Sequence, residues 1–253
     1  MDLKKLRNES DIRGVACEGI EGQHINLTDE AVYELSCGFF TWLGARLGKA
    51  PAALRVGVGR DSRITGPRIL EALKKAAVDM GVSLFDTGLA STPAMFMSTI
   101  TPGFEFDGSI MITASHLPFN RNGLKFFVKE GGLEASDINA IIATAEAGGF
   151  AKVGGGKCES IDFMTVYAKI LVDKIRKGTG KEQPLSGCKI VVDAGNGAGG
   201  FFVRDVLIPL GADTTGSQFL EPDGMFPNHI PNPEDKKAGE SISKAVLAAK
   251  ADL

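Results

Sequence analysis

Aromatic residues, cysteine, histidine and long apolar runs are all scarce in this sequence of 253 residues. Phe, Trp and Tyr together make up 7% of it, and its four cysteines lie far apart without a C-x-x-C pair. Only three histidines accompany them, so the spacing argues against a zinc site and favours reduced thiols in a cytoplasmic protein. No run approaches the length of a membrane span, and the first ten residues contain no apolar signal core.

The sequence also lacks a large excess of charge of either sign, with 28 Lys and Arg residues against 31 Asp and Glu residues. The formal net charge is −3, which gives no electrostatic reason to expect nucleic acid or a membrane as partner. The content of 43% hydrophobic and 23% charged residues is typical of a globular protein. The length allows one large domain or two ordinary ones.

The hydrophobic pattern predicts an α/β fold, because strands and helices alternate along the first half. Strands are expected at 54–59, 82–85, 110–112 and 124–128, and helices at 31–47 and 65–80. The glycine-dense stretch 148–156 reads as a linker, so we place a domain boundary near residue 155. The prediction is two three-layer α/β/α domains with mixed sheets, 1–155 and 156–253, the second incomplete at its C-terminus.

The second half begins with an expected helix over 161–177 and a buried strand over 189–193. Glycine-rich residues 194–200 follow, either as an anion-binding turn or, as we prefer, as a structural turn. Four prolines in 221–233 fix an extended course, in which His229 is expected to be structural. The last helix is expected over 240–250.

The sequence places its densest chemistry in the loop between the strands 110–112 and 124–128. Small and polar residues run from Thr113 to His116, and Asn122-Gly123 suits a tight turn. Lys125 begins the second strand. The pattern predicts a rigid loop that presents a hydroxyl, an imidazole and an ammonium group.

Three roles are open for Ser115. A hydrolase nucleophile would need a base and an orienting acid, and no G-x-S-x-G is present. A structural serine would bond to backbone. A phosphorylated serine would need cations and a proton-transfer group around it, and the sequence offers Arg13, Arg60, Lys125 and His116.

Two motifs carry a resemblance to a known family. Thr113-Ala114-Ser115-His116, followed by Pro118 and Asn122-Gly123-x-Lys125, resembles the phosphoserine loop of the α-D-phosphohexomutases, the phosphoglucomutase/phosphomannomutase superfamily. Asp11-Ile12-Arg13-Gly14 resembles the N-terminal Asp-Ile-Arg-Gly of that family. Leu117 stands where the family usually has Asn. The resemblance covers nearly the whole chain but only the first half of a typical member.

The resemblance implies an isomerase that interconverts hexose 1-phosphate and hexose 6-phosphate through a phosphoserine and a hexose 1,6-bisphosphate. Ser115, Lys125, Arg13 and His116 would be catalytic, and Arg60 and Asn122 would bind phosphate. The segment around Arg60, Gly-Arg-Asp-Ser-Arg over 59–63, resembles a family segment but could equally be a structural salt-bridge cluster. Mg²⁺ would bind to Ser115 through its phosphate, with its other ligands expected beyond Leu253, so the isolated chain is expected to be inactive. The alternative is a non-catalytic phosphosugar-binding or regulatory module. Both the preferred sugar and the oligomeric state are left open.

Overall fold

The computed structural model describes residues 2–253, which divide into two compact units. The first contains residues up to Asp61 together with Thr65–Ala114 and Asn120–Ile161. The second contains Ser62–Ile64, Ser115–Phe119 and Asp162–Leu253.

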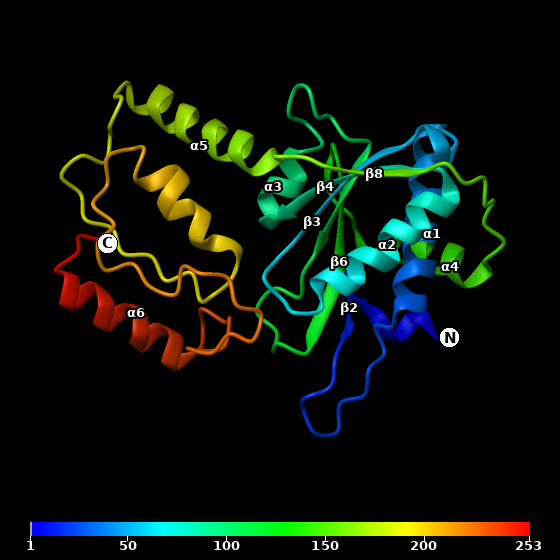
Figure 1. Cartoon of the computed structure of the whole chain (residues 1–253), viewed down its shortest axis with the longest axis horizontal. Helices are drawn as coiled ribbons and strands as arrows, with labels where there is room; N and C mark the ends of the chain where they lie inside the picture. Colours follow the sequence, from blue (N-terminus) through cyan, green and yellow to red (C-terminus); the bar gives the residue numbers. More distant parts are fainter. Residues whose placement is uncertain (1) are drawn as a thin grey trace. The chain divides into compact units, whose positions relative to one another are not determined.

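The first unit is built on an eight-stranded mixed sheet in the order β1-β2-β6-β5-β3-β4-β8, with β7 beside β6 (Figure 1). Its parallel neighbours are β5-β3, β3-β4 and β4-β8, and the remaining pairs are antiparallel. This confirms the prediction of an α/β fold with a mixed sheet. The strands are β1 Arg7–Asn8, β2 Asp11–Val15, β3 Arg55–Arg60, β4 Ser83–Leu89, β5 Gly108–Ile112, β6 Arg121–Val128, β7 Gly131–Gly132 and β8 Lys157–Ser160.

Helices cover both faces of this sheet. Helix α1 (Asp29–Leu47) lies between α2 (Gly66–Met80) and α4 (Ala135–Ala147) on one face, and α3 (Thr92–Met97) lies on the other (Figure 1). The Thr28 hydroxyl accepts the Ala31 N–H at the start of α1, which satisfies one of the unpaired donors there. Short 3₁₀ turns, η1 Leu3–Leu6 and η2 Pro51–Ala53, complete the unit.

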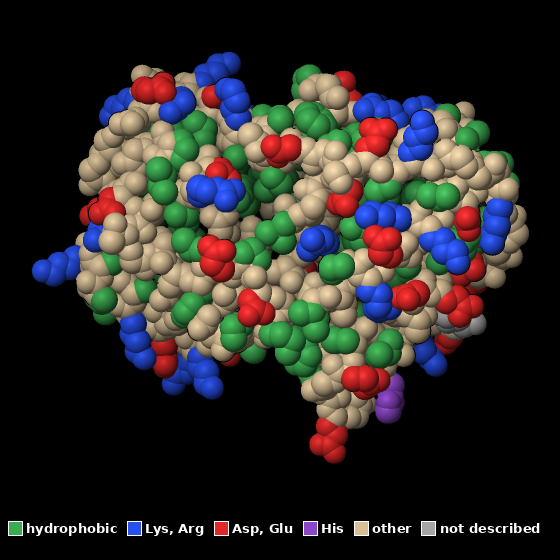
Figure 2. All heavy atoms as spheres, in the orientation of Figure 1, with side chains coloured by type: hydrophobic (Ala, Val, Ile, Leu, Met, Phe, Trp, Pro, Cys, Tyr) green, Lys and Arg blue, Asp and Glu red, His purple; other side chains and the backbone are tan. Residues whose placement is uncertain are grey.

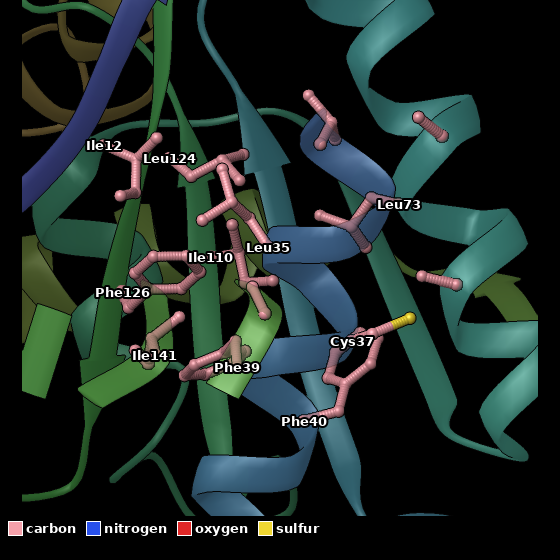
Figure 3. Close-up of a cluster of buried hydrophobic side chains, with 14 of the residues drawn as sticks. Ile12, Leu35, Cys37, Phe39, Phe40, Leu73, Ile110, Leu124, Phe126 and Ile141 are labelled. Carbon is pink, nitrogen blue, oxygen red and sulfur yellow. The ribbon is translucent and has the colours of Figure 1, made fainter. Parts of the chain in front are cut away.

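The main core fills the space between the sheet and α1, α2 and α4. Leu35, Phe39 and Phe40 of α1 point into it, and Phe39 stacks on Phe126 of β6 with ring centroids 4.5 Å apart (Figure 3). Ile12 and Ile110 reach the same cluster from β2 and β5. Side chains alternate along a strand, so the residues next to Ile12 in β2 and next to Phe126 in β6 point away from this core, to the opposite face of the sheet.

Strand β3 shows the same alternation with glycine. Val56 and Val58 lie in the main core, whereas Gly57 and Gly59 face α3 and the segment after it. A Cβ on Gly57 would lie 2.7 Å from the Phe106 ring, and one on Gly59 would lie 2.6 Å from the sulfur of Met95. The glycines of this Val-Gly repeat therefore lie on the face of the sheet where α3 packs too closely for a side chain.

The second unit contains two long helices, α5 Phe163–Thr179 and α6 Lys236–Ala249, with a 3₁₀ turn η3 (Ala198–Gly200) and a π-helical turn η4 (Val203–Leu207) between them. Ala168 and Val172 of α5 pack on Val206 and Leu210. The strand expected over 189–193 forms only isolated bridges, Lys189 with Asp213 and Asp193 with Gln218. Its backbone also bonds to the chain end, where Leu253 O accepts the Val191 N–H at 2.8 Å.

The domain boundary near residue 155 stays a prediction. In the structure the glycine-rich loop after α4 leads into β8, which pairs in parallel with β4. The first unit therefore extends to Ile161. The glycines supply the change of direction between α4 and β8.

The surface mixes charges of both signs. On the face drawn in Figure 2, Lys and Arg side chains lie among Asp and Glu side chains. Across residues 2–253, every helix is too short or too polar to cross a bilayer.

Candidate active site

Two charged motifs that lie far apart in the sequence meet on β2 and β6. The Asp11 carboxylate accepts a hydrogen bond from Nη2 of Arg13 at 2.8 Å and another from Nζ of Lys125 at 2.7 Å. Asp11 is only 7% exposed, whereas the side chains of Arg13 and Lys125 are 20% and 27% exposed. This triad therefore holds one nearly buried carboxylate under two cations that reach the surface.

Strand register explains the triad. Ile12 pairs with Leu124 and Arg13 with Gly123, so the antiparallel ladder brings Asp11 beside Lys125. Ile12 and Leu124 point into the main core, and the charged side chains lie on the opposite face.

The prediction of a tight turn at Asn122-Gly123 is wrong, because both residues lie within β6. Gly123 is needed for close approach instead: a Cβ there would lie 2.1 Å from Ile12 O and 3.1 Å from Cγ of Arg13. Asn122 is fully buried, and its Nδ2 donates to Oγ1 of Thr65 at 2.9 Å. Its phosphate-binding role stays a prediction.

Ser115 is exposed in the loop that follows β5. Its φ of 56° lies in the left-handed region, which a residue with a side chain rarely adopts. Its Oγ lies 3.3 Å from Nδ1 of His116, the neighbouring exposed residue. The loop thus offers a hydroxyl and an imidazole together on a strained backbone.

Arg63 holds the backbone of this loop. Its Nη2 donates to Ser115 O at 2.8 Å and to Leu117 O at 2.7 Å, and its Nη1 donates to Pro118 O at 2.7 Å. Arg63 has no exposed surface. The strained loop is therefore anchored by a buried guanidinium.

Arg60 ends β3 beside Ile112 of β5, so it lies next to the strand that leads to Ser115. Its side chain runs along Gly66, where an added Cβ would lie 3.3 Å from Cδ of Arg60. Asp61 accepts a hydrogen bond from Oγ1 of Thr113 at 2.7 Å, which ties the two strand ends together. The role of Arg60 in phosphate binding stays a prediction.

The described residues do not complete a magnesium site by themselves. Residues 2–253 contain no group of three or more His, Cys, Asp or Glu side chains placed to hold a metal ion. Asp11 is committed to two cations, and Asp61 to Thr113. The residues present therefore do not fit the octahedral oxygen set that Mg²⁺ requires.

In the second unit, Asp193 gathers three segments. Its carboxylate accepts hydrogen bonds from the Gly195 N–H at 2.8 Å and from Nε2 of Gln218 at 2.8 Å, and Nε2 of His229 lies 3.1 Å from both of its oxygens. Nδ1 of His229 lies 2.8 Å from Ile230 O. Burial alone lowers the pKa of His229, but the bonds to Ile230 and Asp193 raise it above its ordinary value. These contacts support the structural interpretation of the glycine-rich turn and of His229.

The structure thus brings together Arg13 with Lys125 and Ser115 with His116. That Arg13 and Lys125 flank Ser115 stays a prediction. The sequence analysis missed the roles of Asp11 and Arg63. Asp11 stands in the Asp-Ile-Arg-Gly motif, and Arg63 lies three positions after the candidate Arg60. Asp11 and Arg13 are two positions apart in a strand, so their side chains lie on the same face, and this spacing could have indicated the role of Asp11.

Comparison with known proteins decides the family. Residues 4–152 match the model of the phosphoglucomutase/phosphomannomutase alpha/beta/alpha domain I, and residues 165–253 match that of domain II. The chain belongs to the phosphoglucomutase/phosphomannomutase family. The resemblance stated from the Ser115 and Arg13 motifs is confirmed.

Several individual members of this family are similar to the chain over nearly its whole length. A phosphoglucomutase of Neisseria meningitidis serogroup B is 31% identical over 252 residues, which cover 96% of this chain and 48% of that protein. A phosphomannomutase/phosphoglucomutase of Pseudomonas aeruginosa is also 31% identical, over 246 residues and 48% of its length. The solved structure of a phosphoglucomutase/phosphomannomutase family protein from Burkholderia thailandensis has a TM-score of 0.78 and 27% identity, over 96% of this chain and 50% of that one. The chain spans about half the length of the mutases it matches.

Proposed function

We propose that this chain supplies the phosphoryl-carrying half of a phosphohexomutase, with Ser115 as the carrier. The observation that carries the proposal is the exposed Ser115 hydroxyl, held at a left-handed φ beside His116 on an anchored loop. In the proposed reaction a hexose phosphate hydroxyl attacks the phosphorus of phosphoserine. The bond from phosphorus to Oγ breaks and a bond from phosphorus to the sugar oxygen forms. The sugar hydroxyl gives up its proton to a neighbouring base, and the Ser115 oxygen takes up a proton to become a hydroxyl again.

The electrostatic demand of this reaction matches the cations on the chain. A phosphoserine carries about −1.5 to −2 charges and strong acceptor oxygens, which cations stabilise. Arg13 and Lys125 are held as a pair by Asp11 and keep part of each side chain at the surface. We propose that both stabilise phosphate charge, that His116 or Lys125 moves the sugar hydroxyl proton, and that Arg60 and Asn122 contact phosphate.

From the family we also propose the substrates, glucose or mannose 1- and 6-phosphates, with a hexose 1,6-bisphosphate as the intermediate. The reaction would take place in the cytoplasm. Mg²⁺ would supply charge neutralisation at the transferring phosphoryl group. Residues 2–253 do not complete its ligand set, so the roles proposed for Ser115, Arg13, Lys125 and His116 do not depend on the ion.

The test is a fusion of this chain to the C-terminal half of the Neisseria meningitidis phosphoglucomutase. After incubation with glucose 1,6-bisphosphate and Mg²⁺, we expect one phosphoryl group on Ser115 by mass spectrometry, and conversion of glucose 1-phosphate to glucose 6-phosphate. Ser115→Ala should lose both. Ser243→Ala, which changes an exposed helical serine bonded to Gly239 O, should keep both. Turnover near the parent rate with Ser115→Ala would reject the carrier.

A second candidate is a non-catalytic phosphosugar-binding or regulatory module. The observation that favours it is that the described residues 2–253 contain no group of three or more side chains placed to hold a metal ion. Binding of glucose 1-phosphate without phosphoryl uptake by the fusion would support this alternative.

A further inference from the structure

Arg63 is the largest fully buried side chain in the part of the chain that the structure describes. Its bonds go to backbone carbonyls of Ser115, Leu117 and Pro118. A planar guanidinium can serve several carbonyls at once with its fixed fork of N–H donors, whereas a lysine ammonium on a flexible stem has no such fork. Arg63 therefore fixes the orientation of the peptide groups on the C-terminal side of Ser115.

A segment distant in sequence supports Arg63, and all residues involved belong to the second compact unit. The Phe226 ring lies 5.2 Å from Cζ of Arg63 and is 8% exposed. Gly224 packs on the backbone of Ser62–Ile64, where an added Cβ would lie 2.3 Å from Ser62 O and 2.4 Å from Ile64 N. Only a glycine leaves room for this contact.

We infer that Arg63, supported by Gly224 and Phe226, is the positioning residue that holds Ser115 in its left-handed conformation. The inference rests on the proposed function, because it gives the reason why the hydroxyl would be presented in one geometry. It also assigns a role to the Pro222-Asp223-Gly224-x-Phe226 segment, which the reaction above does not use. In phosphoryl transfer a misplacement of about 1 Å can cost roughly 10²-fold in rate.

The test uses the chain as it is, with three variants. Arg63→Lys removes the fork of guanidinium N–H donors. Gly224→Ala adds a methyl group, remote in sequence, that pushes against the backbone of Ser62–Ile64 and so disturbs the support of Arg63. Arg68→Lys is the matched control, because Arg68 also donates to backbone carbonyls, those of Ala16 at 2.9 Å and Leu27 at 3.1 Å, but in a different loop.

Two readouts report on Ser115 without any phosphoryl transfer. With ¹³C-labelled serine, the Ser115 Cα resonance, assigned through Ser115→Ala, should show the shift of a positive-φ residue in the parent and in Arg68→Lys. In Arg63→Lys and Gly224→Ala it should move to the random-coil position. Chymotrypsin cleavage after Phe119 should be about tenfold faster in those two variants, as expected for the loss of one net hydrogen bond from a local opening equilibrium.

An unchanged Ser115 resonance and cleavage rate in Arg63→Lys would overturn the inference. If Arg63→Lys does not fold, Phe226→Leu, which removes only the aromatic face beside the guanidinium, decides by the same two readouts. A fusion that takes up no phosphoryl group would reject the proposed function and leave these readouts unaffected, so the two failures are distinguishable.

Discussion

Asp11 shows how a single carboxylate can organise two motifs. It accepts hydrogen bonds from Arg13 and Lys125, and its own side chain is almost inaccessible to water. Removing the charge of Asp11 leaves both cations without their shared carboxylate. This lowers the stability of the fold more than the loss of an exposed ion pair does.

We predict that Asp11→Asn lowers the free energy of unfolding by roughly 1–3 kcal/mol, the usual range for hydrogen bonds to charged groups. Fluorescence of Trp42, the only tryptophan, follows urea unfolding of the first unit. Glu71→Gln is the control, because its ion pair with Lys74 is exposed, and it should change stability by about 0.5 kcal/mol or less. Equal effects of the two substitutions would contradict the structural importance of the triad.

His229 is the residue that predicts a pH dependence. Both ring nitrogens face acceptors, Asp193 and Ile230 O, so both bonds require the protonated ring. Burial lowers the pKa of His229, but these bonds raise it above its usual value in the folded chain. Because the folded pKa is the higher one, the stabilisation is complete below about pH 6.5 and is lost as pH rises through the folded pKa.

We therefore expect amide-exchange protection of residues 193–229, measured after correction for intrinsic exchange, to fall as pH rises above about 6.5. The His229 ring resonances should titrate with a midpoint above the same value. His229→Gln should abolish this pH dependence, and its survival in that variant would point to another group.

At the scale of elements, glycine marks where segments approach one another. Gly57 and Gly59 leave room on the α3 side of β3, and Gly123 lets β6 pair with β2. None of these three has a positive φ, so their function is to leave space rather than to form turns.

Gly123→Ala should separate β2 from β6, because the new methyl carbon would lie 2.1 Å from Ile12 O. We expect a loss of roughly 2 kcal/mol or more in the Trp42-monitored unfolding of the first unit. Gly132→Ala on neighbouring β7 is the control, since its nearest neighbour is a Phe127 ring carbon at 3.7 Å, an ordinary contact. A loss no greater than that of Gly132→Ala would mean that the strands accommodate the methyl group.

At the scale of the whole molecule, the chain matches two domain models and about half of each mutase relative. We predict that the chain by itself does not interconvert hexose phosphates, because residues 2–253 lack a metal donor set. The measurement is conversion of glucose 1-phosphate to glucose 6-phosphate with Mg²⁺ and a bisphosphate activator, for the chain and for the fusion. Comparable turnover by both would show that the second half is dispensable.

The sequence by itself determined the local structure and the family. Helices expected over 31–47, 65–80, 161–177 and 240–250 correspond to α1, α2, α5 and α6, because periodicity and caps act over a few residues. The strands around 54–59, 82–85, 110–112 and 124–128 were predicted for the same reason. The Ser115 and Arg13 motifs were sufficient to indicate the family, which the domain matches confirm.

Only the tertiary structure decided which distant groups meet. Lys125 bonds to a carboxylate 114 positions away, and Arg63 bonds to carbonyls more than 50 positions away. Gly123 looked like a turn residue but serves a strand contact, and β8 joins the sheet of the first unit beyond the expected boundary. Local preferences extend over a few residues, whereas strand register and the partners of a buried guanidinium depend on how whole faces pack.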